Sequence, residues 1–228
     1  MKYSNLEKGI FIKRPNRFIA HVLLKGKEEI VHVKNTGRCR EILQEGTSVI
    51  LEKAQNPRRR TKYSLIAAYK GELLINIDSQ VPNQVVFNSL KEGILPGFNY
   101  PLEVKREVSY KNSRFDLYFK EGDKEGFIEV KGVTLEKQGK AMFPDAPTER
   151  GRKHILDMIQ AVEDGYQAYI FFLIQFQGAN YFSPNIATDP EFAQALQRAK
   201  EKGVKILAYD SLVTENSINL NKEIPVIL

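Results

Sequence analysis

Six short apolar segments separated by turns occupy residues 9–77, and no other feature of the chain constrains the fold as strongly. They are residues 9–14, 18–24, 29–33, 48–53, 63–69 and 72–77. Two of the turns, at Lys25-Gly26 and Lys70-Gly71, have the composition of hairpin turns. Five or six strands in so short a stretch favour a small closed barrel, because closure removes exposed strand edges. We therefore expect residues 1–79 to form an oligonucleotide-binding-like (OB-like) barrel, with one helical turn at residues 38–43.

From residue 80 the pattern changes to helices that alternate with strands. Helices are expected at residues 81–90, capped near Asn83, at 148–165, capped by Thr148, and from Asp189 to Gly203. Strands are expected at about residues 102–109, 114–119, 127–133, 168–174 and 204–209, and the segment from Asn216 onward is left unassigned. This order indicates a mixed α/β sheet with crossover connections. Residues 80–228 are thus expected to form a second, α/β domain, in a chain that is α+β overall.

The charge of the chain is unevenly distributed. The net charge of +6 consists of +8 in residues 1–79 and −2 in residues 80–228. Such a basic module would attract a polyanion toward the more neutral module, although a solvated basic surface is the plainer alternative. The densest basic cluster follows Asn56-Pro57, where an exposed loop is expected, and consists of Arg58, Arg59, Arg60 and Lys62.

Other global features favour a cytoplasmic protein. The single cysteine, Cys39, excludes an internal disulfide and suits a reducing compartment. No apolar run approaches the roughly 18 residues of a membrane helix, so no membrane contact is expected. Residues 1–8 lack the apolar core of a signal peptide.

Three charged residues interrupt two apolar strands of the second domain. Asp116 lies within Ser113-Arg-Phe-Asp116-Leu-Tyr-Phe, and Glu129 and Lys131 lie within Phe127-Ile-Glu-Val-Lys131, beyond a hairpin loop expected at residues 120–126. A charge in such a strand is costly unless it is paired, and residues two apart project from the same face of a sheet. Two carboxylates and a lysine suit phosphodiester cleavage: Asp116 and Glu129 would bind Mg²⁺ or Mn²⁺, and Lys131 would stabilise the developing charge. The alternative is an exposed edge hairpin with ordinary cross-strand ion pairs.

A proline-containing loop leads into the helix expected at residues 148–165. Pro144 and Pro147 stiffen this loop, and the backbone amides at the start of the following helix attract anions. We expect a phosphate-binding surface there, formed by Arg150, Arg152, Lys153 and His154. For the histidine, a structural hydrogen-bonded role is an equally plain alternative.

These motifs resemble those of two groups of proteins. Phe115-Asp116 and Glu129-Val-Lys131 stand in the positions of the two motifs of the PD-(D/E)XK nuclease superfamily. The wider pattern is similar to the sugar fermentation stimulation protein A family in Ser113-Arg-Phe-Asp116, Glu129-Val-Lys131-Gly-Val-Thr-Leu135, Ala141-Met-Phe-Pro-Asp-Ala-Pro-Thr-Glu-Arg-Gly-Arg-Lys-His154 and Ala208-Tyr209. The resemblance extends over about residues 14–209, and the motif at residues 141–154 is very specific.

The resemblance implies an OB-like N-terminal domain joined to a nuclease-like domain, in a DNA-binding protein linked to the regulation of sugar metabolism. Two positions depart from the superfamily pattern: Phe115 stands where proline usually precedes the aspartate, and residues 81–90 lack the acid often found on the preceding helix. Nearby acids that could replace it are Glu92, Glu103 and Glu107.

We therefore expect a DNA-binding protein with a divalent-metal site of the phosphodiester-cleaving kind. The alternative is a catalytically silent DNA-binding regulator of sugar (maltose-type) metabolism. Whether the DNA is single- or double-stranded, and whether the protein forms a homodimer, both stay open.

Overall fold

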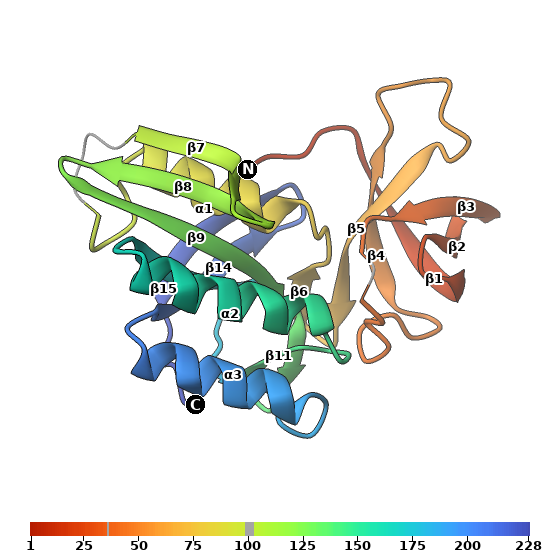
Figure 1. The fold of residues 1–228 in the computed structure, drawn as a ribbon. Helices are drawn as coiled ribbons and strands as arrows, with labels where there is room; N and C mark the ends of the chain where they lie inside the picture. Colours follow the sequence, from red (N-terminus) through yellow and green to blue (C-terminus); the bar gives the residue numbers. More distant parts are fainter. Residues whose placement is uncertain (36, 99–102) are drawn as a thin grey trace.

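The computed structural model describes residues 1–35, 37–98 and 103–228 (Figure 1). The expected fold class is confirmed, because an OB-like β-barrel is followed by a mixed-sheet α/β domain. Figure 1 shows the barrel strands beside the α/β domain, whose sheet lies between helices. Within the described residues, no helix is long and apolar enough to cross a membrane.

The barrel is built from five strands and extended by a sixth. Its sheet has the order β3-β2-β1-β4-β5-β6, and a parallel pairing of β3 with β5 closes it. This closing contact joins His32 to Ser64 and Val33 to Leu65. The expected helical turn is present: Cys39 O accepts hydrogen bonds from Leu43 N (2.8 Å) and Ile42 N (3.2 Å). The strand bounds are β1 Leu6–Asn16, β2 Ile19–Leu24, β3 Lys27–Val33, β4 Ser48–Lys53, β5 Tyr63–Lys70 and β6 Leu73–Asn76.

The α/β domain is organised around a six-stranded sheet of order β15-β14-β12-β9-β8-β7. The central strands β9, β12 and β14 are parallel, and the flanking pairs are antiparallel. The bounds are α1 Val81–Lys91, β7 Glu103–Tyr110, β8 Ser113–Glu121, β9 Lys124–Val133, α2 Glu149–Glu163, β12 Gln167–Ile174, α3 Pro190–Glu201, β14 Lys205–Thr214 and β15 Ser217–Glu223. A separate small sheet contains β10 Leu135–Lys137, β11 Lys140–Phe143 and β13 Tyr181–Pro184.

The helices cover the two faces of this sheet because the strands alternate their apolar side chains. Val85 of α1 packs with Ile128, Val130 and Phe171 in one buried cluster. Ile155 of α2 packs in the other cluster, on the opposite face. Figure 1 shows α3 lying alongside α2. The central strand β9 is therefore buried on both sides, and a charged residue on it is largely removed from water.

Several expected boundaries change in the structure. The hairpin between β8 and β9 is tighter than expected, since the strands continue to Glu121 and from Lys124. Thr148 caps α2 as expected, by accepting a hydrogen bond from Gly151 N (3.0 Å). The predicted cap of α1 at Asn83 is wrong: the N-cap is Gln80, which makes no side-chain capping bond. Of the strand expected at residues 102–109, residue 102 lies outside the described residues.

Direct hydrogen bonds join the barrel to the α/β domain. Asn76 N, at the end of β6, donates to Gln175 O (2.9 Å), and Gln175 Nε2 donates back to Asn76 Oδ1 (3.0 Å). Farther along the interface, Arg38 N donates to Asp145 Oδ2 (2.8 Å). Gly37 fits closely here, because a Cβ at this position would lie 2.6 Å from Asp145 Oδ2.

The first residues of the chain also bind to the α/β domain before β1 begins. Tyr3 N donates to Asn216 O (2.8 Å), and Lys2 forms an isolated bridge with Ser217. The Tyr3 side chain is buried, and its hydroxyl accepts a hydrogen bond from Asn76 Nδ2 (2.8 Å). These residues thus connect the start of β15 to the barrel.

Candidate metal-binding and catalytic site

Asp116 lies where strands β8 and β9 stop pairing. Their ladder runs from Glu121 and Lys124 to Leu117 and Ile128. At the next position the Asp116 carboxylate takes the place of a backbone carbonyl as the acceptor, because its Oδ2 accepts a hydrogen bond from Val130 N (2.8 Å). Oδ1 accepts one from Nδ2 of Asn83 on α1 (2.7 Å). Asp116 is therefore held between two strands and a helix.

Glu129 lies on β9, between β8 and β12, and is only 3% exposed. Its Oε1 accepts a hydrogen bond from Lys131 Nζ (2.6 Å) and also contacts His154 Nδ1. Its Oε2 is buried and has no hydrogen-bond partner within the described part of the chain. A buried carboxylate oxygen is normally paired, so this atom is available to a ligand.

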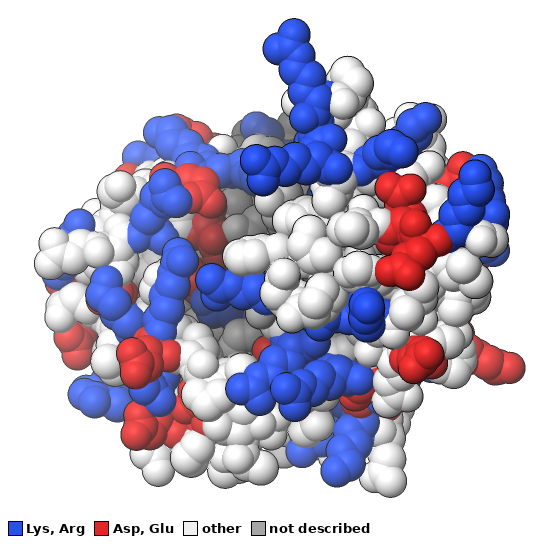
Figure 2. Space-filling view, turned by 90° about the vertical axis from the view of Figure 1, so that its right-hand side faces the viewer, with Lys and Arg blue, Asp and Glu red and all other residues white. Residues whose placement is uncertain are grey.

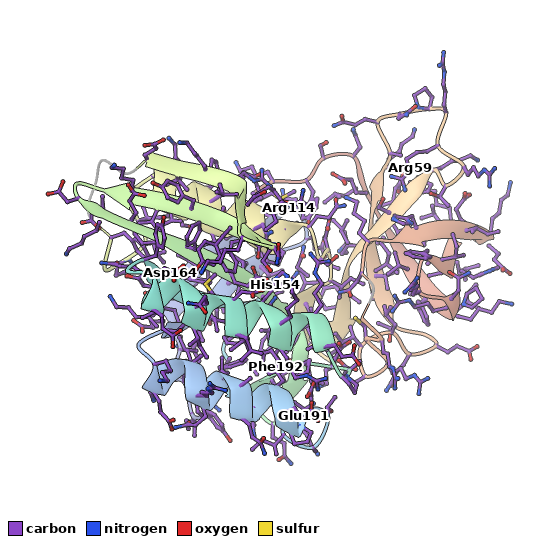
Figure 3. The ribbon with its side chains drawn as sticks, viewed as in Figure 1. Arg59, Arg114, His154, Asp164, Glu191 and Phe192 are labelled. Atoms are coloured by element: carbon purple, nitrogen blue, oxygen red, sulfur yellow. The ribbon has the colours of Figure 1, made fainter. Side chains whose placement is uncertain are left out.

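Lys131 and His154 hold Glu129 from two elements. Lys131 lies two residues farther along β9, and its side chain is 14% exposed. His154 extends from α2 into the space between this helix and the sheet (Figure 3). Arg150 Nε donates to His154 Nε2 at 3.5 Å, so His154 accepts at Nε2 and its Nδ1–H donates to Glu129 in this tautomer.

Burial and charge move the pKa values of the two carboxyls in opposite directions. Burial, followed by the nearby negative charge of Glu129, raises the pKa of Asp116 to about 6. Burial would also raise the pKa of Glu129, but Lys131 and His154 outweigh it and hold that pKa below its ordinary value. A second carboxylate is thus difficult to ionise beside the first unless a cation lies near both.

The donor set fits a hard divalent cation, with only two carboxylates to bind it. Mg²⁺ is commonly bound by one or two carboxylates together with water and substrate phosphates. Within the described ranges, no group of three or more His, Cys, Asp or Glu side chains is arranged to bind a metal. Glu103 pairs with Lys105 and Glu107 with Arg114, and from α1 it is an amide, Asn83, that reaches the site.

The expected basic loop of the barrel is only partly free. Arg58, Arg60 and Lys62 are exposed, whereas Arg59 is half-buried. Arg59 donates to Ser64 Oγ (3.0 Å) and to Thr61 Oγ1 (3.0 Å), and so stabilises its own loop (Figure 3).

At the start of α2, two of the expected phosphate ligands bind protein groups. Arg152 Nη1 pairs with Asp189 (3.1 Å) and Glu191 (2.8 Å) at the start of α3. Lys153 Nζ donates to Asn112 O (3.2 Å) and Ser113 Oγ (3.0 Å) at the turn between β7 and β8. Arg150 is exposed, and within the described part of the chain its side chain donates a hydrogen bond to His154 alone. The structure therefore brings His154 to Glu129 and directs Arg152 and Lys153 elsewhere.

Asn83 belongs to the site, whereas the sequence alone predicts a capping role for it. It was expected to cap the helix, because asparagine near a helix start is a common cap. Its position in the sequence could have indicated the contact with the site, because Asn83 is a polar residue between Pro82 and Val85, and both of these are buried against the sheet that carries Asp116.

The fold and this site define a two-domain protein, in which an OB-like barrel is joined to an α/β domain with a cluster of Asp116, Glu129 and Lys131 that is buried at Glu129 and half-buried at the other two. Residues 12–77 match the family described as "SfsA N-terminal OB domain". Residues 80–217 match the family described as "Sugar fermentation stimulation protein RE domain". The chain belongs to the sugar fermentation stimulation protein family.

Individual relatives agree over nearly the whole chain. A sugar fermentation stimulation protein homolog of Alkaliphilus oremlandii (strain OhILAs) is 52% identical over 231 residues, covering 99% of this chain and 98% of that protein. The homolog of Clostridium perfringens (strain 13 / Type A) is 51% identical over 230 residues and covers 100% of both. A solved structure described as Pyrococcus furiosus SfsA in complex with Ca²⁺ is 29% identical, with a TM-score of 0.92, and covers 100% of this chain and 98% of that chain.

Proposed function

We propose that this protein binds DNA and cleaves phosphodiester bonds at a divalent-metal site formed by Asp116, Glu129 and Lys131. The observation that carries the proposal is the unpartnered, buried Oε2 of Glu129, next to the half-buried carboxylate of Asp116. The Ca²⁺ complex of the Pyrococcus furiosus relative supports a cation-binding role, since Ca²⁺ and Mg²⁺ both prefer carboxylate oxygens. Cytoplasmic location stays a prediction from the single, buried Cys39.

Each residue of the cluster has a separate part in this proposal. Asp116 and Glu129 would hold Mg²⁺ or Mn²⁺, which when bound polarises the phosphate and acidifies a water molecule. Lys131 places a positive charge beside these carboxylates, where negative charge develops on the phosphate oxygens. Asn83 and His154 orient the two carboxylates through the hydrogen bonds described above.

The test is cleavage of plasmid, single-stranded and hairpin DNA in the presence of Mg²⁺, Mn²⁺ or EDTA. We expect metal-dependent cleavage that is lost in Asp116→Asn, Glu129→Gln and Lys131→Met. Asp123→Asn and Lys124→Met are matched controls, because both side chains are exposed at the turn of the same hairpin. Cleavage that persists in EDTA, or in all three site variants, would show that this cluster is not the catalytic site.

A catalytically silent DNA-binding regulator of sugar metabolism is the second candidate. It is favoured by Asn83, an amide that occupies the place near Asp116 where the superfamily often has an acid. In this case DNA binding would survive every site variant, and none of the metals would produce cleavage by the wild-type protein.

A further inference from the structure

A strongly basic pocket is formed by β1, the turn after it and the segment after β3, and no residue of the Asp-Glu-Lys cluster lines it. Its volume is about 300 Å³. Half of the lining residues are arginines and none is acidic; the lining consists of Phe11, Arg14, Asn16, Arg17, Gly37, Arg38, Arg40 and Leu43. Figure 2 shows a face of the molecule where lysine and arginine side chains cover more of the surface than acidic ones do.

Arg14 builds this pocket and is not free to bind a ligand through its Nη atoms. Its Nη1 donates to Gly37 O (2.8 Å) and Arg38 O (2.9 Å). Its Nη2 donates to Arg17 O (2.8 Å) and Asn35 O (2.6 Å). Arg14 thereby fixes the turn between β1 and β2 against the segment after β3, which positions the other arginines.

The three remaining arginines are exposed, and within the described part of the chain their guanidinium groups have no carboxylate partner. Arg17, Arg38 and Arg40 form no ion pair with any carboxylate of the described residues. Three unpaired guanidinium groups around one pocket repel each other, and an anionic ligand would relieve this repulsion. Phosphate is well matched, because a guanidinium group can donate two parallel hydrogen bonds to it.

An aromatic platform stands beside these charges. Phe18 is 45% exposed, and the Arg17 guanidinium lies 4.8 Å from the centre of its ring. Exposed aromatic rings next to arginines stack nucleobases in many proteins that bind single strands. The strand register also brings the basic loop at residues 58–62 near Phe18. Ile19 pairs with His32, and His32 pairs with Ser64, which lies just beyond this loop.

A second pocket leads from this surface toward the Asp-Glu-Lys cluster. It shares Arg17 and Gly37 with the first pocket and has a volume of about 410 Å³. Its far wall includes Gly132, which follows Lys131 directly, and Thr148, which begins α2. One acid, Asp145, lies in this wall, where its Oδ2 accepts the hydrogen bond from Arg38 N.

We propose that these two adjoining pockets bind a single strand of nucleic acid and lead it from the barrel toward the Asp-Glu-Lys cluster. Pockets of about 300–1,000 Å³ enclose small-molecule ligands, so each of these two has room for a nucleotide unit and not for a double helix. Arg17, Arg38 and Arg40 bind phosphates, and Phe18 stacks a base. That the strand runs toward the Asp-Glu-Lys cluster rests on the proposed cleavage at this cluster. The binding of a single strand in the two pockets does not depend on cleavage.

The experiment measures binding of a fluorescein-labelled single strand by anisotropy, in EDTA, with a hairpin duplex of the same length as competitor. We expect the wild type to prefer the single strand by at least about tenfold. The triple variant Arg17→Gln/Arg38→Gln/Arg40→Gln should lose binding by about 30-fold or more, and the slope of log K against log salt should become shallower by about 2. Phe18→Ser should lose about tenfold, since stacking on one base has effects of this size.

Arg198→Gln is the charge control, because Arg198 is exposed on α3 and lines neither pocket. It should bind as the wild type does, and circular dichroism should show every variant to be folded. The inference is overturned if the triple variant retains wild-type affinity, if Arg198→Gln weakens binding equally, or if the duplex competes as well as the single strand. Because EDTA removes the metal, binding without cleavage in the metal-containing assay would refute the proposed function alone.

Discussion

Asp116→Asn should stabilise the metal-free protein at neutral and alkaline pH. In the folded protein the pKa of Asp116 is raised to about 6, from its ordinary value of 3.8, by burial and then by the charge of Glu129. Between these two pH values the folded state keeps a proton that the unfolded chain has lost. Stability therefore falls as pH rises from about 4 to 6 and stays reduced above 6.

The magnitude follows from the size of this shift. A rise of about two pKa units corresponds to about 3 kcal/mol of unfavourable ionisation when the carboxyl is fully charged. At pH 4.5 this ionisation already lowers the free energy of unfolding of the wild type by about 1 kcal/mol. The difference in the free energy of unfolding between Asp116→Asn and the wild type should therefore increase by about 2 kcal/mol from pH 4.5 to pH 8. The asparagine can still accept from Val130 N, and Asn83 can turn its amide to accept from the new NH₂ group.

The assay is urea denaturation in EDTA at pH 4.5, 6 and 8, followed by circular dichroism. Asp123→Asn, at the exposed turn of the same hairpin, is the control and should show no such pH-dependent difference. Excess Mg²⁺ at pH 8 should then stabilise the wild type more than Asp116→Asn, because a bound cation stabilises only the folded carboxylate pair. A wild-type-to-variant difference that is constant across this pH range would refute the reasoning about Asp116.

Three further predictions concern the neighbours of the site and the domain interface. Lys131→Met should lower kcat for metal-dependent cleavage by about 100-fold or more while Lys124→Met leaves it unchanged, which steady-state kinetics on a labelled DNA strand will measure. His154→Ala should weaken Mg²⁺ binding by about 10- to 100-fold in calorimetry, and His154→Asn should weaken it less, because its amide can still donate to Glu129. Gly37→Ala should reduce the free energy of unfolding by about 1–3 kcal/mol, and the loss should shrink in an Asp145→Ala background if the crowded contact with this carboxylate is the cause.

The local pattern of the sequence predicted the elements whose structure depends on nearby residues. The barrel strands appeared because short apolar segments and hairpin turns lie next to each other along the chain. Strand β15 was not predicted, since Ser217–Glu223 contains mostly polar residues and lies at the edge of the six-stranded sheet, next to β14. A polar edge strand has little periodic signal, and its identity depends on the partner.

The site shows the same division between local and long-range information. Asp116, Glu129 and Lys131 stood out because charges are rare in strands that are otherwise apolar, and the structure places all three together. The side chains of Asn83, Arg152 and Lys153 donate hydrogen bonds to segments 33 to 41 residues away, which no local pattern reveals. The unpartnered oxygen of Glu129 is likewise a property of packing from several elements.

The hydrogen bond between Tyr3 and Asn216 can form only late in synthesis of the chain on the ribosome. Asn216 is synthesised more than two hundred residues after Tyr3, which at translation speeds of about 5–20 residues per second means a wait of roughly 10–40 s. Throughout this time the nascent barrel must expose the surface that Tyr3 and Asn76 later bury. Chaperone dependence during synthesis should therefore concentrate on this surface, and it should end once Asn216 and β15 have left the exit tunnel.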